Sequence, residues 1–242
     1  MRSTCSSAPT CATSSWRTCW SLSDGTPSRA MNASEIAEYY AAERPELLAF
    51  LRPHGRFGAA LDVGCAAGML GAGLLREGIV GACDGIELNY AAARHAETRL
   101  RQVWMGSLES AAADVPWEHY DLVILADVLE HLADPWAALR LLQARTAPGC
   151  KLMLSVPNVR HYKVSLPLLF KGEFRYEDAG IMDRTHLHFF TRGSLEETVR
   201  DCGWTVRAWG SHMKGRYRRW YMPTRLLEPF VAVQYMLLAE KQ

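Results

Sequence analysis

The chain has 242 residues, a formal net charge of +1, 49% hydrophobic residues and 22% charged residues. This length suits one large domain with a substantial core, and the balanced charge argues against a general nucleic-acid binder. No apolar run reaches the roughly 18 residues of a membrane helix, and seven cysteines without a Cys-x-x-Cys pair indicate neither a zinc site nor a disulfide framework. We therefore expect a cytoplasmic protein.

Residues 1–30 differ from the rest of the chain. They are rich in Ser and Thr, contain one acidic residue and show no hydrophobic periodicity. We expect this segment to be a disordered leader or a misassigned start, with Met31 as the true first residue, and a transit peptide is the alternative. Residues 31–242 are then expected to form a single domain.

Strands and helices are expected to alternate from residue 34 to residue 156. A capping box of Asn32 and Glu35 opens a helix over 34–51. Asn89 is expected to cap a helix over 90–100, and Asp134 one over 135–145 that begins with Pro135. The remaining elements are a helix at 69–76 and strands at 59–63, 80–87, 102–105, 122–126 and 152–156. This alternation predicts a doubly wound, mostly parallel α/β sheet.

Two inserts interrupt the pattern after residue 156. Residues 157–190 and 210–228 are too long for ordinary connections, and such segments are typically lids or substrate-binding loops. Between them we expect a helix that Thr191 caps and a strand at 205–208, and a last strand follows at 231–238.

The most informative segment is residues 61–71, LDVGCAAGMLG, where a short apolar strand runs into a glycine turn and then a helix. Such a turn lets a ligand approach the backbone at a helix start. Glu87 ends the next strand, where a carboxylate can accept hydrogen bonds from both ribose hydroxyls. The Gly-x-Gly-x-x-Gly and P-loop motifs are absent, and Asp62 would repel a pyrophosphate. These features predict an adenosine ligand that carries a cation or an amine.

These segments resemble motifs of the class I S-adenosylmethionine (SAM) methyltransferases. Residues 61–71 resemble the first motif, Glu87 the second, and residues 120–132, YDLVILADVLEHL, the fourth. Residues 230–238 are similar to the last strand, so the resemblance covers about residues 34–240. It implies a Rossmann-like sheet of seven strands with an antiparallel last strand, SAM as the methyl donor and S-adenosylhomocysteine as the product.

The resemblance also implies roles for the residues of the turn. Asp62 would receive the ammonium of SAM, Gly64 and Gly68 would line its methionine part, and Glu87 would bind its ribose. Ala66 stands where the family usually has glycine, and we expect it to be tolerated only with a negative φ; otherwise SAM affinity falls.

Ser107 stands where many relatives carry an aspartate that binds the adenine amino group. A hydroxyl can accept the same hydrogen bond, and the alternative is that Ser107 only shapes its turn. The residues that complete the expected cofactor-binding set are Cys65, Leu88, Leu108 and Asp127. Near the N-terminus, Tyr39, Tyr40 and Arg44 are candidates to cover SAM, or belong to a plain amphipathic helix.

Candidate catalytic residues lie after the strand 122–126 and in the first insert. Methyl transfer to oxygen needs alignment and a base for the hydroxyl proton, and histidine suits that role. The candidates are His131, Asp183, His186 and His188. A structural role, in which a histidine donates to a backbone carbonyl or packs its loop, is the alternative. Asp183, His186 and His188 could also ligate a metal. No further carboxylates cluster nearby in the sequence, so we expect no bound metal.

Residues 155–158 and 183–191 are similar to a bacterial subgroup associated with polysaccharide and glycan biosynthesis. We therefore expect O-methylation of a sugar, a glycan precursor or another small hydroxylated metabolite. Alternatives are a phenolic quinone precursor, an amine or a carboxylate, or a SAM-binding protein without turnover. A basic and aromatic segment fits a phosphate-bearing acceptor or a solvated loop; its residues are Lys214, Arg216, Tyr217, Arg218, Arg219, Trp220, Tyr221 and Arg225.

Overall fold

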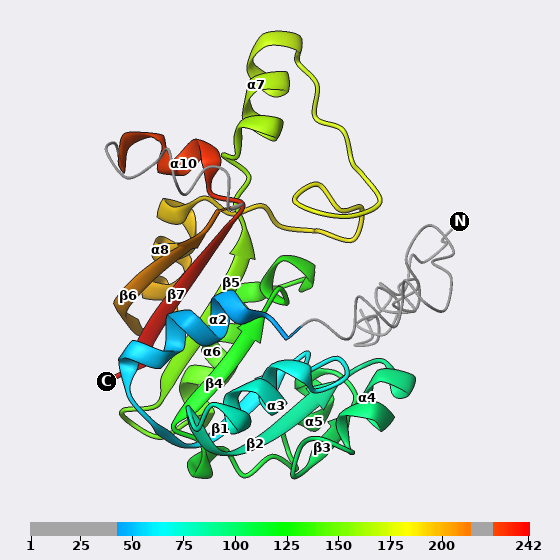
Figure 1. Ribbon diagram of the computed structural model, residues 1–242, viewed down its shortest axis with the longest axis vertical. Coiled ribbons are helices and arrows are strands. Elements are labelled where there is room, and N and C mark those ends of the chain that lie inside the picture. Colours follow the sequence, from blue (N-terminus) through cyan, green and yellow to red (C-terminus); the bar gives the residue numbers. More distant parts are fainter. Residues whose placement is uncertain (1–42, 214–224) are drawn as a thin grey trace, which may run out of the picture.

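The computed structural model describes residues 43–213 and 225–242. Their centre is a seven-stranded sheet with the strand order β3-β2-β1-β4-β5-β7-β6 (Figure 1). The strands are β1 (Phe57–Val63), β2 (Val80–Glu87), β3 (Val103–Met105), β4 (Leu122–Ala126), β5 (Lys151–Pro157), β6 (Trp204–His212) and β7 (Gln234–Lys241). Strands β1 to β5 are parallel, and β7 is antiparallel to both β5 and β6. The predicted fold class is confirmed.

Helices cover both faces of the sheet. One face packs against α2 (Pro45–Leu51), α3 (Met69–Arg76) and α4 (Tyr90–Ala96), and the other against α5 (Leu108–Ala111), α6 (Pro135–Arg145) and α8 (Arg192–Asp201). The central strand β4 contributes alternate residues to the two cores, and residues 122–125 are fully buried. This is why that strand is uniformly apolar rather than alternating.

Helix starts follow the expected capping residues. The Asn89 side chain accepts a hydrogen bond from Ala92 N–H, and the Asp134 side chain accepts one from Ala137 N–H. Thr191 and Ser194 form a capping box at the start of α8. These side chains satisfy backbone donors that a helix leaves unpaired in its first turn, so the local sequence determines where α4, α6 and α8 begin.

The end of the chain differs from expectation. The last strand was expected to begin at residue 231, but Val231 ends α10 (Glu228–Val231), which follows η4 (Arg225–Leu227), and β7 begins only at Gln234. The cause is a tertiary contact, since the buried Asn158 amide donates to the carbonyls of Pro229 and Ala232, both at 2.8 Å. Strand β6 correspondingly extends to His212, which pairs with Gln234.

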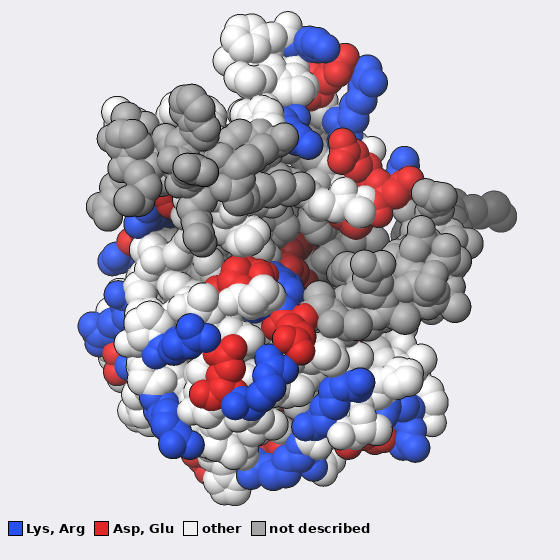
Figure 2. Space-filling view, in the orientation of Figure 1, with Lys and Arg blue, Asp and Glu red and all other residues white. Residues whose placement is uncertain are grey.

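The first insert contains a helix that was not expected, α7 (Tyr162–Lys171), with Pro167 inside it. In Figure 1 this helix and the chain that follows it stand beyond the carboxyl ends of β4 and β5. A bridge between Asn158 and Phe190 closes the base of the insert. At the upper end of Figure 2 the insert shows an uncharged surface with side chains of both signs beside it, and both signs of charge also alternate over the opposite end of the molecule.

Two other expectations fall partly on residues outside the described ranges. The leader and residues 34–42 of the first helix lie there, as does most of the basic and aromatic segment at 214–225. Helix α4 ends at Ala96 rather than at residue 100, and residues 97–101 form turns that bring Arg101 back to Asp84 on β2. Within the described ranges, no helix combines the length and apolar character needed to cross a bilayer.

Candidate functional site

The turn between β1 and α3 is held against the neighbouring strand and the loop after β4. The N–H groups of Gly64 and Cys65 donate to the Ile86 carbonyl at 2.8 and 3.1 Å. Gly64 has φ +73°, and a Cβ built there would lie 2.6 Å from Cγ2 of Val128. Gly68 caps α3 with φ +76°. A side chain at position 64 would therefore be both strained and crowded, which accounts for this glycine.

Ala66 adopts φ +48°, in the left-handed region that favours glycine. Alanine was expected to be tolerated at this position only with a negative φ, and the structure does not meet that condition. The conformation points the Ala66 N–H at Glu87, whose Oε2 accepts it at 2.8 Å. The strain at Ala66 therefore accompanies the contact that couples the turn to the end of β2.

Glu87 lies at the end of β2, as predicted, and its side chain is largely buried. Its Oε1 also accepts the N–H of Asn89, at 2.7 Å. Burial raises the pKa of Glu87, although the backbone N–H donors act in the opposite direction. A carboxylate offers about four acceptor positions, so two remain for a ribose diol.

Asp62 is 2% exposed at the carboxyl end of β1. Burial, followed by the nearby charge of Glu87, raises its pKa to about 7, and Arg44 acts in the opposite direction. Among the described residues, none donates a hydrogen bond to this carboxylate. A buried carboxylate without donors is costly, and an incoming ammonium group would compensate it. The chemistry of Asp62, Glu87 and the glycine turn thus fits the amino-acid tail and ribose of the expected methyl donor.

The other expected cofactor residues follow the carboxyl ends of β1, β2, β3 and β4. Ser107 is the N-cap of α5, and its Oγ accepts the Ser110 N–H at 3.2 Å, which favours the turn-shaping role while leaving its own hydroxyl proton available to a ligand. Cys65 and Leu108 are buried in the two cores. Leu88 is 52% exposed beside Glu87, where it can cover an adenosine.

Asp127, immediately after β4, is bound by residues from three other elements. It adopts φ +56°, and its Oδ2 accepts a hydrogen bond from Arg44 Nη1 at 2.6 Å. Its Oδ1 accepts from the amide of Gln234 and, at 3.5 Å, from the hydroxyl of Ser155. Arg44 also contacts Glu46 at 2.6 Å. These bonds bring the start of α2 to the carboxyl edge of the sheet, next to Asp127.

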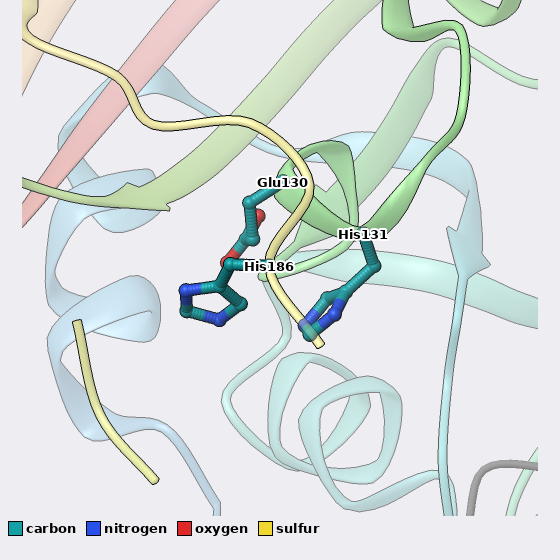
Figure 3. A group of neighbouring side chains, drawn as sticks. All are labelled: Glu130, His131 and His186. Carbon is teal, nitrogen blue, oxygen red and sulfur yellow. The ribbon is translucent and has the colours of Figure 1, made fainter. Parts of the chain in front are cut away.

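Beyond Asp127, the structure brings together Glu130, His131 and His186, and we call this group the Glu-His-His cluster (Figure 3). Glu130 and His131 belong to η3 (Leu129–His131), and His186 comes from the insert. One potential ligand atom of each residue lies within 4.8 Å of the others. Two of the four candidate catalytic residues, His131 and His186, are thus neighbours.

Glu130 is the member of the cluster that was not predicted as a site residue. Its side chain is 1% exposed, and neither carboxylate oxygen has a hydrogen-bond partner among the described residues. Burial raises the pKa of Glu130 well above its usual value, while burial and His186 lower the pKa of His131. The sequence feature that could have identified Glu130 is its position between the apolar residues Leu129 and Leu132, which indicates that its carboxylate is buried.

Asp183 and His188 lie outside the cluster. The Asp183 Oδ1 accepts the backbone N–H and the hydroxyl of Thr185, at 2.8 and 2.7 Å, and thereby shapes a turn. The His188 ring stands edge-on to Trp136, and its Nε2 lies 3.4 Å from the Ala133 carbonyl. These contacts match the structural alternative that was left open for at least one histidine.

Aromatic side chains of the insert lead up to the cluster. The ring centroids of Phe174 and Phe189 are 5.3 Å apart, and Tyr176 lies 6.1 and 6.0 Å from them. Phe189 is 6.3 Å from the ring of His186. Phe174 and Tyr176 remain 40% and 47% exposed, so this aromatic group offers apolar surface next to polar groups, as ligand sites commonly do.

Comparisons with known proteins agree with this geometry. A family model described as a methyltransferase domain matches residues 33–208. Ubiquinone biosynthesis O-methyltransferases are similar in sequence: that of Aeromonas salmonicida is 29% identical over 61% of this chain and 63% of its own length, and that of Psychrobacter arcticus is 29% identical over 75% and 70%. The chain thus spans less than two thirds of the Aeromonas protein.

Solved structures show the same fold. A SAM-dependent methyltransferase from Archaeoglobus fulgidus has a TM-score of 0.60 and 17% identity, with 87% of this chain and all of that one covered. One from Mesorhizobium loti has a TM-score of 0.55 and 15% identity, with 83% and 98% covered.

Proposed function

The chain belongs to the methyltransferase domain family, whose methyl donor is SAM, and we propose that its acceptor is a phenol. The phenol would be of the quinone-precursor type, and the methyl group would go to its hydroxyl oxygen. The observation that carries the proposal is the row of aromatic side chains, Phe174, Tyr176 and Phe189, which ends at His186. Aromatic rings pack favourably against one another at these centroid separations. An acceptor that presents a ring to the insert and a hydroxyl to the Glu-His-His cluster would use both features.

The similar proteins support a phenol over a sugar. The names of these relatives refer to O-methylation in ubiquinone biosynthesis, and neither name refers to a glycan. Acidity favours a phenol as well, because a phenolic hydroxyl ionises near pH 10, whereas an unactivated O–H such as that of water has a pKa of about 15.7. A phenol therefore asks less of the residues that must help it lose a proton.

One group of residues at the carboxyl edge of the sheet would bind SAM, and another would bind the acceptor. Bound SAM supplies a methyl group already activated by a sulfonium. Asp62 would hold the ammonium of the amino-acid tail, and Glu87 the ribose hydroxyls. The Glu-His-His cluster would face the acceptor hydroxyl and lower the cost of removing its proton. The insert would exclude water from the acceptor ring.

The test is a competition among acceptors. Purified protein is incubated with methyl-labelled SAM and equal concentrations of a prenylated catechol, a simple catechol and a nucleotide-linked sugar, and the products are identified by mass spectrometry. We expect a phenyl methyl ether with the prenylated catechol as the preferred acceptor, and no product from Glu87→Ala. Methylation of the sugar alone would overturn the proposal and restore the glycan hypothesis.

A further inference from the structure

Two strained residues at the carboxyl edge of the sheet are joined by one side chain from the last strand. Arg44 and Asp127 have φ +53° and +56°, in the left-handed region that is unfavourable for residues with a side chain. Arg44 Nη1 donates to Asp127 Oδ2 at 2.6 Å. The Gln234 amide completes a ring, because its Nε2 donates to Asp127 Oδ1 and its Oε1 accepts from Arg44 Nη2 at 3.2 Å. We call these three residues the edge ring.

The local sequence does not account for an arginine at position 44. Arg44 is the N-cap of α2, where Asn, Asp, Ser and Thr are favoured because their side chains accept a backbone N–H. An arginine side chain has no acceptor, and within the described residues Arg44 makes no capping bond. Its side chain extends instead to the edge ring. Backbone strain persists only where the surrounding structure enforces it, and here the enforcing contacts come from the end of β4 and the start of β7.

The conformation of Asp127 sets the direction of the loop that follows β4. The next residue, Val128, lies against the cofactor turn, where its Cγ2 would be 2.6 Å from a Cβ built at Gly64. Further along, the same loop carries two members of the Glu-His-His cluster. The Asp127 carboxylate accepts from Arg44, Gln234 and the Ser155 hydroxyl, which uses three of about four acceptor positions. Little of this carboxylate is left for a ligand.

We propose that Gln234 is a positioning residue for SAM binding and methyl transfer. Its amide holds Arg44 and Asp127 in their left-handed conformations. The edge ring thereby keeps the loop after β4 against the cofactor turn and the start of α2 beside that loop. Asp127, which was expected among the cofactor-binding residues, then acts through the path of its loop and not through its carboxylate. This role is the same for any acceptor.

The test exchanges the amide and the carboxylate of the edge ring. Gln234→Leu removes both bonds of the amide, and Gln234→Glu places a second carboxylate against Asp127. Each should weaken SAM binding at least about tenfold by calorimetry, because a bond to a charged group is lost. The double variant of Asp127→Asn with Gln234→Glu again has one amide, one carboxylate and the guanidinium, and it can form every bond of the ring. It should bind SAM within about threefold of the wild type, since asparagine tolerates a positive φ.

Glu240→Gln is the matched control on the same strand. Glu240 pairs with Lys151 and Arg207 at 2.9 and 2.6 Å, near the other end of β7. This substitution removes charged contacts from β7 and leaves the edge ring intact, so it should bind SAM like the wild type. Hydrogen exchange of residues 127–131 should be faster in the two single variants of Gln234 and normal in both the double variant and the control.

Three results would overturn the proposal. Wild-type affinity for SAM in folded Gln234→Leu would show that the edge ring is not needed. A double variant that melts like the wild type but binds SAM as weakly as Gln234→Glu would show that the Asp127 carboxylate acts on SAM directly. Loss of folding in every variant of Gln234, measured by circular dichroism, would assign this residue to stability alone. None of these measurements uses an acceptor, so failure of the phenol proposal would leave them unaffected.

Discussion

The ionised carboxylate of Asp62 is expected to lower the free energy of unfolding of the protein without ligand. It is 2% exposed, and burial together with Glu87 raises its pKa from 3.8 to about 7. The folded state therefore binds more protons at this site than the unfolded state between these two values, so the free energy of unfolding falls as pH rises through that window. At about 1.4 kcal/mol per pKa unit, the full effect is about 4 kcal/mol.

The substitution Asp62→Asn removes the ionisation and keeps the shape. We expect the variant without ligand to be more stable than the wild type at pH 8, and the difference between the two proteins to grow by about 2–3 kcal/mol from pH 5 to pH 8. Urea denaturation followed by circular dichroism measures both quantities. The same variant should bind SAM at least tenfold more weakly, because the ammonium loses a charged partner.

Asp84 provides the matched control on the adjacent strand. It is as buried as Asp62, but its carboxylate accepts hydrogen bonds from Arg101 and from the Tyr120 hydroxyl, both at 2.6 Å. Asp84→Asn should therefore destabilise the protein by about 1–3 kcal/mol. The reasoning about burial would be refuted if Asp62→Asn were no more stable than the wild type at pH 8, or if its advantage did not change with pH.

Three further changes probe the same edge of the sheet. Glu87→Gln should weaken the binding of both SAM and methylthioadenosine at least tenfold, as measured by calorimetry. Asp62→Asn should leave the binding of methylthioadenosine unchanged, because this ligand lacks the amino-acid tail. Equal losses of affinity for methylthioadenosine in the two variants would contradict the assigned positions. Ala66→Gly should relieve the φ of +48° and raise the melting midpoint, with a gain of about 1 kcal/mol, and an unchanged or lower midpoint would mean that Ala66 is not strained. Asn158→Ala removes two buried hydrogen bonds to the α10 region and should cost about 2–3 kcal/mol in urea denaturation, so a loss below 0.5 kcal/mol would contradict its role.

The sequence predicts those parts of the fold that local patterns determine. The bounds of β2, β4 and α3 agree with the expected ranges, because uniform apolar runs, glycine turns and capping residues act within a few positions of each other. The start of the last strand was predicted three residues too early because a side chain distant in sequence, Asn158, holds the residues around Val231 in a helical turn. No local pattern carries that information.

Some residues of the candidate site could likewise be predicted from local sequence, and others could not. Asp62 and Glu87 could be placed from sequence because parallel strands bring their carboxyl ends to one edge. The association of Glu130 with His186 depends on how the insert folds back, where the Leu187 and His188 N–H groups donate to the Glu130 carbonyl at 2.8 and 3.1 Å. Spacing alone could not distinguish His186 from His188, because only the path of the insert decides which ring faces η3.

The distribution of unfavourable features is itself evidence for where ligands bind. The non-glycine residues with positive φ in the described chain are Arg44, Ala66 and Asp127, and all of them lie around the carboxyl edge of the sheet. At the opposite edge, Asp121 accepts two backbone N–H groups, from residues 58 and 59 at 2.7 and 3.1 Å. Strain and unpaired buried charge persist only where the surrounding structure compensates for them, and they concentrate at functional sites. We therefore propose that the carboxylates of Asp62 and Glu130 gain their partners when ligands bind.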